Sequence, residues 1–439
     1  MQNLYTQTAS LDQRARVEFA LSEPLMMEHA AMGIERIIRA RFSHDSMVLI
    51  VCGPGNNGAD GRILARLLEG DYTVSTNYDS HKHYDVIVDA LLGSGLTRPL
   101  DSLTQELINT LNTTHALKIA CDVPTGLYPD GSLDSHVFQA DITVTMGALK
   151  LGLFSDAAKE IVGEIHVCDL GVSRKRYEVP TPWQLLDTSD LQLPLRTHLS
   201  THKGSYGHLC VVCGEKSGAA TIAASAALRF GAGLVTLLSN ENVAVPYELM
   251  QSHSLPSTST TIALGMGLGT EFCDDELTHL LDNTLPLVLD ADIFYHSMFP
   301  KLLKRNNIVL TPHPKEFIQI LRLTGIAGID VTTLQNDRFT YAQRFCNAFP
   351  NTVLVLKGAN VIIGYNDRLY INPHGTVALA KGGSGDVLSG LIGALLAQGN
   401  TPLDAAIHAS LAHALGAKKF TKNNYALTPF DLIESITTL

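Results

Sequence analysis

The chain has 439 residues, of which 45% are hydrophobic and 17% are charged, and its formal net charge is −11. That length exceeds one average hydrophobic core, so we expect two domains. The acidic balance argues against a nucleic-acid partner, because binding to a phosphate backbone requires an excess of basic residues.

The sequence also shows no membrane span or export signal. No apolar run approaches the roughly 20 residues that a membrane-spanning helix needs, and residues 1–21 lack a basic-then-apolar pattern. The seven cysteines mostly lie in apolar, strand-like runs. Cys210 and Cys213 share one such run, where residues three apart point to opposite faces, so a metal or redox pair is not expected. We predict core cysteines, a reducing compartment and a cytoplasmic protein.

The chain begins with a helical pattern over residues 11–41, interrupted near Pro24. An apolar strand over residues 48–52 then leads into Gly-Pro-Gly-Asn-Asn-Gly-Ala-Asp-Gly-Arg at 53–62, and a helix is predicted from Ala59 to Leu68. A strand, a glycine-rich turn and a helix in this order are typical of the phosphate-binding start of a βαβ unit.

Two interpretations of this turn remain open. Gly53, Gly55 and Gly58 match G-x-G-x-x-G, and Asp79 lies about 20 residues on, as in dinucleotide-binding sites. Against that reading, a carboxylate at Asp60 would repel a pyrophosphate in the first helical turn. The residue types at 56, 57 and 60 fit a hard monovalent cation together with an acid or base instead.

Two further strands end in polar loops. Residues 85–92 run into Gly-Ser-Gly-Leu-Thr-Arg-Pro at 93–99, and residues 117–121 run into Asp-Val-Pro-Thr-Gly at 122–126. In open α/β sheets the carboxyl ends of the strands share one crevice, which predicts a binding site formed by these loops. Residues 174–201 are proline-rich and aperiodic, so we place a domain boundary near residue 190.

In the second half, polar and glycine-rich loops again follow apolar strand-like runs, although no internal repeat joins the two halves. The last of these loops is the most informative motif of the chain. Three glycines, at 382, 383 and 385, precede Asp386 and an apolar helix over residues 387–397. Glycine amides at a helix start form an anion pocket. Asp386 beside it could accept the proton of a hydroxyl that attacks a phosphoryl group. The alternative is a glycine turn with Asp as a helix cap.

The motifs together resemble two known families. Residues 53–61, 93–99 and 122–126 resemble the NAD(P)H-hydrate epimerase domain. The motifs at 202–204, 231–235, 311–314, 357–359 and 382–390 resemble the ribokinase-like NAD(P)H-hydrate dehydratase domain. Their order resembles bifunctional bacterial repair enzymes. The resemblance implies an α/β fold in two domains, with a Rossmann-like α/β/α sandwich over residues 1–190 and a ribokinase-like α/β/α domain over residues 191–439.

The resemblance also implies binding residues. In the first domain, contacts to the hydrated nucleotide are expected from Asn56, Asn57, Gly58, Ala59, Asp60, Gly93, Ser94, Gly95, Leu96, Thr97, Arg98, Pro99 and Asp122. A potassium ion is expected at Asn57, Asp89 and Thr125. In the second domain, the hydrated nucleotide is expected at Ala219, Gly267, His313 and Asp386, and the adenine nucleotide at Lys357, Gly358, Ala359, Asn360, Val361 and Gly385.

Four positions depart from the family pattern. Ala59 and Lys315 stand where the family usually has glycine, and Val361 and Lys381 stand where it usually has threonine. None of these changes removes an acid or a base, so they bear on affinity more than on chemistry.

The resemblance implies repair of NADH and NADPH hydrated at C6 of the nicotinamide ring. The first half would interconvert the R and S epimers, with Asp60 or Asp122 as the proton-transfer group. In the second half Asp386 would act as the base while ADP, with Mg²⁺, is consumed to AMP and phosphate. We expect a homo-oligomer with no nucleic-acid or membrane partner. The alternative is a vitamin-type small-molecule kinase fused to a non-catalytic nucleotide-binding or dimerisation domain.

Overall fold

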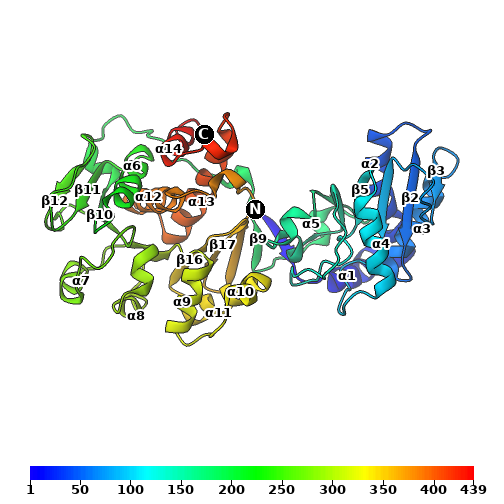
Figure 1. Cartoon of the computed structure of the whole chain (residues 1–439), viewed down its shortest axis with the longest axis horizontal. Helices are drawn as coiled ribbons and strands as arrows, with labels where there is room; N and C mark the ends of the chain where they lie inside the picture. The colour runs from blue at the N-terminus through cyan, green and yellow to red at the C-terminus, as the bar shows by residue number, and fades with distance from the viewer. The chain divides into compact units, whose positions relative to one another are not determined.

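The computed structural model describes all residues, Met1–Leu439, and divides into two compact units. The first comprises Gln2–Gln184, and the second comprises Leu185–Leu439 together with Met1. Figure 1 shows the first unit in blue to cyan-green and the second in green to red. The strand β9 (Trp183–Leu185) lies where the units divide.

The first unit is built on a parallel six-stranded sheet in the order β3-β2-β4-β5-β6-β8. A separate parallel pair joins β1 to β7. The strands are β1 (Gln2–Tyr5), β2 (Met47–Cys52), β3 (Thr73–Ser75), β4 (Val86–Ala90), β5 (Leu117–Cys121), β6 (Ile142–Met146), β7 (Leu149–Lys150) and β8 (Glu164–Cys168). The chain adds β3 on one side of β2 and β4 on the other, so the strand order reverses at β2 and β4. Ligands in such sheets bind at that point, outside the carboxyl ends of the strands.

Helices cover both faces of this sheet. They are α1 (Ala9–Phe19), α2 (Glu23–Arg41), α3 (Asn56–Leu68), α4 (Ser102–Thr113) and α5 (Arg174–Tyr177). Alternate residues of β2 enter different cores, because successive strand residues point to opposite faces. Ile50 packs with α2 and α3, whereas Leu49 packs with Leu111 of α4. The unit is therefore a three-layer α/β/α sandwich.

The ends of two helices differ from the predicted pattern. The break near Pro24 is confirmed, because Ala20 ends α1 in the left-handed region and Ser22 caps α2. Helix α3 begins at Asn56, so the predicted start at Ala59 was wrong. The extended backbone at Gly55 lets the helix begin directly after the turn, and Asp60 is consequently the fifth helical residue.

The second unit contains a longer sheet in the order β12-β11-β10-β13-β14-β15-β16-β17-β18. Neighbours from β12 to β16 are parallel, and β17 and β18 are added antiparallel. The strands are β10 (His208–Val212), β11 (Leu234–Leu238), β12 (Met250–Ser252), β13 (Thr261–Leu264), β14 (Leu287–Leu289), β15 (Ile308–Leu310), β16 (Thr352–Leu356), β17 (Val361–Tyr365) and β18 (Arg368–Asn372). Here the strand order reverses between β10 and β13, which places the expected ligand crevice beside the loops that follow them.

Helices again lie on both faces. They are α6 (Ser217–Arg229), α7 (Asp274–Leu280), α8 (Phe299–Leu302), α9 (Pro314–Leu323), α10 (Val331–Asn336), α11 (Arg338–Ala348), α12 (Ser384–Ala397), α13 (Pro402–Lys419) and α14 (Pro429–Ile436). One core joins the sheet to α6, α12, α13 and α14 and includes Ile363 of β17. The next residue, Gly364, faces Cys346 of α11 on the opposite side.

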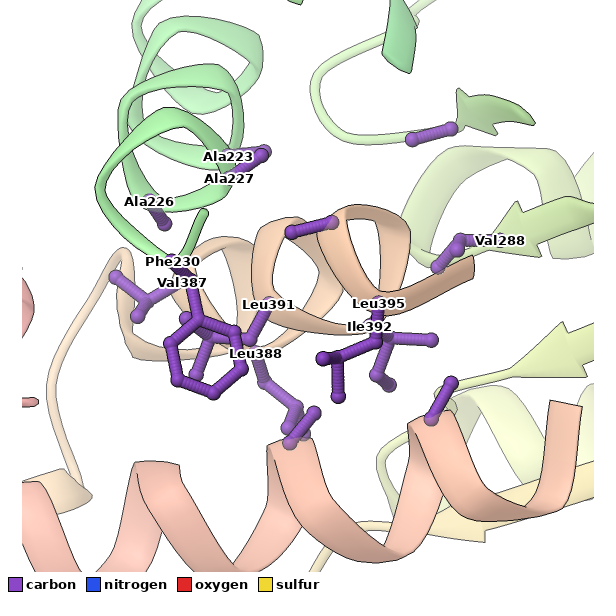
Figure 2. Close-up of a cluster of buried hydrophobic side chains, with 14 of the residues drawn as sticks. Ala223, Ala226, Ala227, Phe230, Val288, Val387, Leu388, Leu391, Ile392 and Leu395 are labelled. Atoms are coloured by element: carbon purple, nitrogen blue, oxygen red, sulfur yellow. The ribbon is translucent and has the colours of Figure 1, made fainter. Parts of the chain in front are cut away.

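Close packing of α12 on α6 sets the position of the glycine-rich motif. Figure 2 shows Leu388, Leu391 and Ile392 of α12 in one buried cluster with Phe230, the residue that follows α6. A Cβ atom on Gly390 would lie 2.1 Å from the carbonyl oxygen of Ala223, so the two helix backbones meet where no side chain fits. This contact holds the N-terminus of α12, and therefore Asp386, in place.

The α/β fold class in two domains, predicted from the sequence, is confirmed. None of the helices combines the length and the apolar character that crossing a bilayer requires.

Candidate active sites

The first unit has a cavity of about 570 Å³ at the carboxyl ends of β2, β4 and β5. The predicted residues among those that line it are Asn56, Asn57, Asp60, Gly93, Ser94, Gly95, Leu96 and Asp122. Lining residues that the sequence did not indicate include Asp12, Arg16, Met26 and Lys150. The cavity thus contains four carboxyl groups, contributed by α1, α2, α3 and the loop after β5. That of Glu23 lies 3.9 Å from the guanidinium of Arg16.

Two of the lining side chains are buried and lack hydrogen-bond partners. Both amide atoms of Asn57 and Oδ1 of Asp60 are unpartnered. A buried polar group without a partner is costly, so these atoms point to a bound ligand or ion. Burial, reinforced by the neighbouring charges of Asp122 and Asp12, raises the pKa of Asp60 to about 7.

Asp122 has the opposite environment. The Lys150 ammonium lies 2.5 Å from Oδ1, and the backbone amides of Met146 and Ser94 donate to Oδ1 and Oδ2, each at 3.2 Å. Burial raises the pKa of Asp122, but the Lys150 charge and these hydrogen bonds outweigh it, so the net shift is downward. Asp122 also has φ of 71°, a left-handed conformation that is uncommon for a residue other than glycine.

The predicted cation ligands Asp89 and Thr125 contact each other and are not among the residues that line the cavity. Asp89 is completely buried and accepts hydrogen bonds from the Thr125 amide and hydroxyl, both at 2.7 Å, and from the Leu91 amide at 3.1 Å. Burial raises its pKa to about 6, although these hydrogen bonds lower it.

The remaining predicted residues of this half lie outside the main cavity. Thr97 lines a smaller adjoining cavity of about 270 Å³. A Cβ on Gly58 would lie 1.8 Å from the Gly53 carbonyl oxygen, so Gly58 allows the tight turn itself. Ala59, Arg98 and Pro99 are not among the lining residues, and the last two are exposed. Their binding roles stay predictions.

Asp79, which the dinucleotide-binding reading required, is also absent from the cavity lining. Its carboxylate accepts a hydrogen bond from the His81 amide instead, at 2.9 Å.

In the second unit a charged cluster lies beside the start of α12. Lys357 Nζ is 2.9 Å from Asp290 Oδ1, and the Ser389 hydroxyl donates to Asp290 Oδ2 at 2.8 Å. A Cβ on Gly385 would lie 3.3 Å from Lys357 Nζ, so the glycine-rich loop and the lysine are neighbours. Although burial lowers the pKa of Lys357, the charges of Asp290 and Glu316 raise it overall, and the ammonium form is retained.

Asp386 occupies the first turn of α12, after Gly383 at φ 89°. The left-handed conformation of Gly383 turns the following amides toward the helix N-terminus, where they have no intrahelical acceptor. Burial and the nearby charge of Asp290 raise the pKa of Asp386 to about 7, opposed by Lys357. A carboxyl that titrates near neutrality beside free amides is suited to general base chemistry on a phosphoryl acceptor.

His313 begins α9 as its cap. Its Nδ1 accepts from the amides of Lys315 and Glu316, and its Nε2 lies 3.2 Å from Glu316 Oε1. Burial raises the pKa of Glu316 to about 7, again opposed by Lys357. His313, Glu316 and Lys357 are therefore electrostatically linked.

The other predicted residues of this half lie in the first turn of α6, in the loop after β13 and around the turn between β16 and β17. Ala219 is close to Gly267, because a Cβ on Gly267 would lie 3.2 Å from the Ala219 Cβ. Gly358 and Ala359 are exposed, and Val361 begins β17. The Asn360 carbonyl accepts a hydrogen bond from buried Arg338, at 3.2 Å, which the sequence did not indicate.

Comparison with known proteins covers both units. Residues 209–438 match a family model described as NAD(P)H-hydrate dehydratase, and residues 23–82 and 70–152 match one described as YjeF-related protein N-terminus. The bifunctional NAD(P)H-hydrate repair enzyme Nnr of Helicobacter pylori is 41% identical and covers 99% of each chain. The Escherichia coli protein of that name is 32% identical and covers 94% of this chain and 89% of its own.

The chain belongs to the family of bifunctional NAD(P)H-hydrate repair enzymes. Among solved structures, the ADP/ATP-dependent NAD(P)H-hydrate dehydratase from Bacillus subtilis, co-crystallised with ATP and Mg²⁺, is 30% identical. It covers 55% of this chain and 92% of that one, with a TM-score of 0.47.

Membership of the NAD(P)H-hydrate repair family confirms the predicted function, epimerisation and ADP-dependent dehydration by two halves of one enzyme. It does not favour the alternative of a small-molecule kinase with a non-catalytic partner domain.

Proposed function

We propose that residues 1–190 form the epimerase domain and residues 191–439 the dehydratase domain of this repair enzyme, with Asp386 as the base of dehydration. The observation that supports the role of Asp386 most directly is its position. It stands in the first turn of α12, where burial and the charge of Asp290, opposed by that of Lys357, bring its pKa to about 7.

The dehydration follows from that position. Asp386 removes the proton of the C6 hydroxyl while the hydroxyl oxygen attacks the terminal phosphorus of ADP, and AMP leaves. The amides after Gly383 stabilise negative charge on the transferred group. Phosphate then leaves C6 with the bonding electrons, a proton is lost from C5, and the ring double bond is restored. The oxygen atom of the former C6 hydroxyl is released as part of the phosphate.

A magnesium ion fits the charge of this site. Burial and mutual repulsion among Asp290, Asp292, Glu316 and Asp386 raise the pKa of the last two to about 7. Mg²⁺ typically uses one or two protein carboxylates together with substrate phosphates. We infer that Asp386 and Glu316 face the metal-bound phosphates, where the ion would supply electrostatic stabilisation.

A potassium ion fits the first site. The Asn57 side-chain oxygen has no partner, and Asp89 and Thr125 add hard oxygen atoms of the kind that such a cation prefers. Bound there, the ion would orient the nucleotide phosphate beside the turn at 53–58. The buried, unpartnered Asn57 is the feature that supports this assignment.

Adenine nucleotide is proposed to lie against residues 357–361, close to Gly385. Arg338 supports this loop through its hydrogen bonds to the carbonyls of Leu356, Lys357 and Asn360. The seven free cysteines agree with the cytoplasm as the compartment. The proposed homo-oligomeric state can be measured by light scattering.

The proposal is tested with two variants of the full chain and two assays. In Asp386→Asn, recovery of NADH from S-NADHX with ADP should be lost, while interconversion of the epimers, measured by chromatography, should persist. In Asp60→Asn the pattern should reverse. Near-normal dehydration by Asp386→Asn would contradict the assignment of the base.

A further inference from the structure

Lys150 is a buried lysine at the epimerase cavity whose ammonium group is fully engaged. It ends β7 and is 5% exposed. Its Nζ lies 2.5 Å from Asp122 Oδ1, 2.9 Å from the Thr145 hydroxyl oxygen and 3.2 Å from the Met146 carbonyl oxygen. An ammonium group has three donors, so these partners use all of them. Lys150 therefore acts on Asp122 and keeps no donor for a substrate.

Asp122 is held as a fixed anion. Its Oδ1 accepts from Lys150 and the Met146 amide, and its Oδ2 accepts from the Ser94 amide. An ionised carboxylate has about four acceptor sites, so Oδ2 retains capacity on the cavity side. The left-handed backbone at Asp122 is the kind of local strain that functional sites retain.

Asp60 lines the same cavity without an ion-pair partner. Its Oδ1 has no hydrogen-bond partner, and the charges that act on it come from Asp122 and Asp12. Asp12 in turn accepts a hydrogen bond from the Tyr177 hydroxyl at 2.6 Å. Of the four carboxyls at the cavity, Asp122 is paired with Lys150, Glu23 with Arg16, and Asp12 accepts from Tyr177, so the proton that the cavity retains belongs on Asp60.

We propose that Lys150 divides the epimerisation chemistry between two carboxyls, fixing Asp122 as the proton acceptor and leaving Asp60 as the proton donor. This inference rests on the proposed function of the first domain and deepens it. Lys150 is a positioning residue, because it acts through Asp122.

The division suits ring opening at the hydrated carbon. Asp122 takes the proton of the C6 hydroxyl while Asp60 gives a proton to N1. The C6–N1 bond breaks, its electron pair goes to N1, and the hydroxyl oxygen forms a C6 carbonyl. After rotation about C5–C6, N1 attacks the other carbonyl face, N1 returns its proton to Asp60, and Asp122 returns its proton to the oxygen. The enzyme regains its starting state, and the same pair serves both directions.

The test compares Lys150→Met, Asp122→Asn and the double variant in the full chain. R-NADHX is supplied without ADP, and formation of the S epimer is followed by chromatography. We expect Lys150→Met and Asp122→Asn each to lower kcat by about 100-fold or more, with KM changed less than about threefold. The double variant should match Asp122→Asn alone, because the lysine acts through that carboxylate. Lys175→Met, an exposed lysine of the same domain, should retain wild-type rates.

The outcomes distinguish a failure of the proposed epimerase function from a failure of the role assigned to Lys150. If wild type does not interconvert the epimers, the proposed function of the domain fails. If wild type is active but Lys150→Met keeps its kcat, or the double variant multiplies the two single losses, the inference fails alone. The double variant leaves no buried charge unpaired, so it remains informative if Lys150→Met does not fold. In H₂¹⁸O the S epimer should keep its C6 oxygen, and incorporation at each turnover would overturn the ring-opening step.

Discussion

Replacing Arg338 by methionine removes the side chain that supports the proposed nucleotide loop from beneath. Arg338 is 4% exposed and begins α11. Its guanidinium donates to the carbonyls of Asn360 and Leu356, each at 3.2 Å, and of Lys357 at 2.9 Å. Methionine can fill much of the space but donates to none of these oxygens.

The size of the effect follows from those three bonds. A hydrogen bond to a charged group contributes about 1.5–3 kcal/mol. The loop between these carbonyls includes the exposed residues Gly358 and Ala359, so water can replace part of the loss. We expect unfolding of the second unit to become about 3–5 kcal/mol easier. Because the loop also loses its fixed position, KM for ADP should rise by about tenfold or more.

The assay is urea denaturation followed by circular dichroism, together with initial rates at 340 nm over a range of ADP concentrations. Arg344→Met is the matched control, because Arg344 lies on the same helix, is exposed, and stacks over the Tyr341 ring at 5.4 Å. Arg344→Met should lower the free energy of unfolding by less than about 1 kcal/mol. Equal urea midpoints and equal KM values for the two variants would show that Arg338 does not support the nucleotide loop.

Three further predictions address packing, acid–base chemistry and the cation. Gly390→Ala should destabilise the second unit by about 1–3 kcal/mol, because the new Cβ would lie 2.1 Å from the Ala223 carbonyl oxygen. Gly218→Ala, which meets nothing within 4 Å, should not destabilise it in the same thermal melt. Dehydration kcat/KM should rise with pH through about 7, because Asp386 must be ionised to accept a proton. The pKa of Asp386 is higher in the folded than in the unfolded protein. Its ionisation therefore lowers the free energy of unfolding as the pH rises from the unfolded-state pKa to the folded-state pKa. Asp386→Asn should therefore be more stable than wild type at pH 8, on the order of 1–2 kcal/mol after allowance for solvent screening, and no more stable at pH 4. K⁺ should raise the Tm of the first unit relative to Na⁺, and Asn57→Leu should abolish that difference; an equal response of the variant would contradict the cation site.

Sequence patterns predicted the parts of the site that depend on local structure. The turn after β2 and the glycines before Asp386 are recognisable because their backbone conformations limit the residues that can occupy them. The parallel strands were recognisable as short apolar runs followed by polar loops. These features were sufficient to place Asp60 and Asp122 at one sheet edge before any geometry was known.

The supporting residues could not be predicted in this way. Lys150 and Arg338 lie far along the chain from the groups they hold, and neither belongs to a motif. Asp290 follows an ordinary buried strand, and its pairing with Lys357 joins β14 to β16. Such pairings depend on how the strands are ordered in the sheet. A signal was present in Lys150, since a lysine in an otherwise apolar run calls for a partner.

Repair of both epimers by this one chain can be measured on the unmodified enzyme. A mixture of R- and S-NADHX is incubated with ADP, Mg²⁺ and K⁺, and absorbance at 340 nm is followed to its end point. If both domains are active in this one chain, the recovered NADH should equal the sum of both epimers. An end point at the S fraction, beyond which the signal rises no faster than in an enzyme-free control, would contradict an epimerase in the first domain. No recovery with either ADP or ATP would contradict the dehydratase as well.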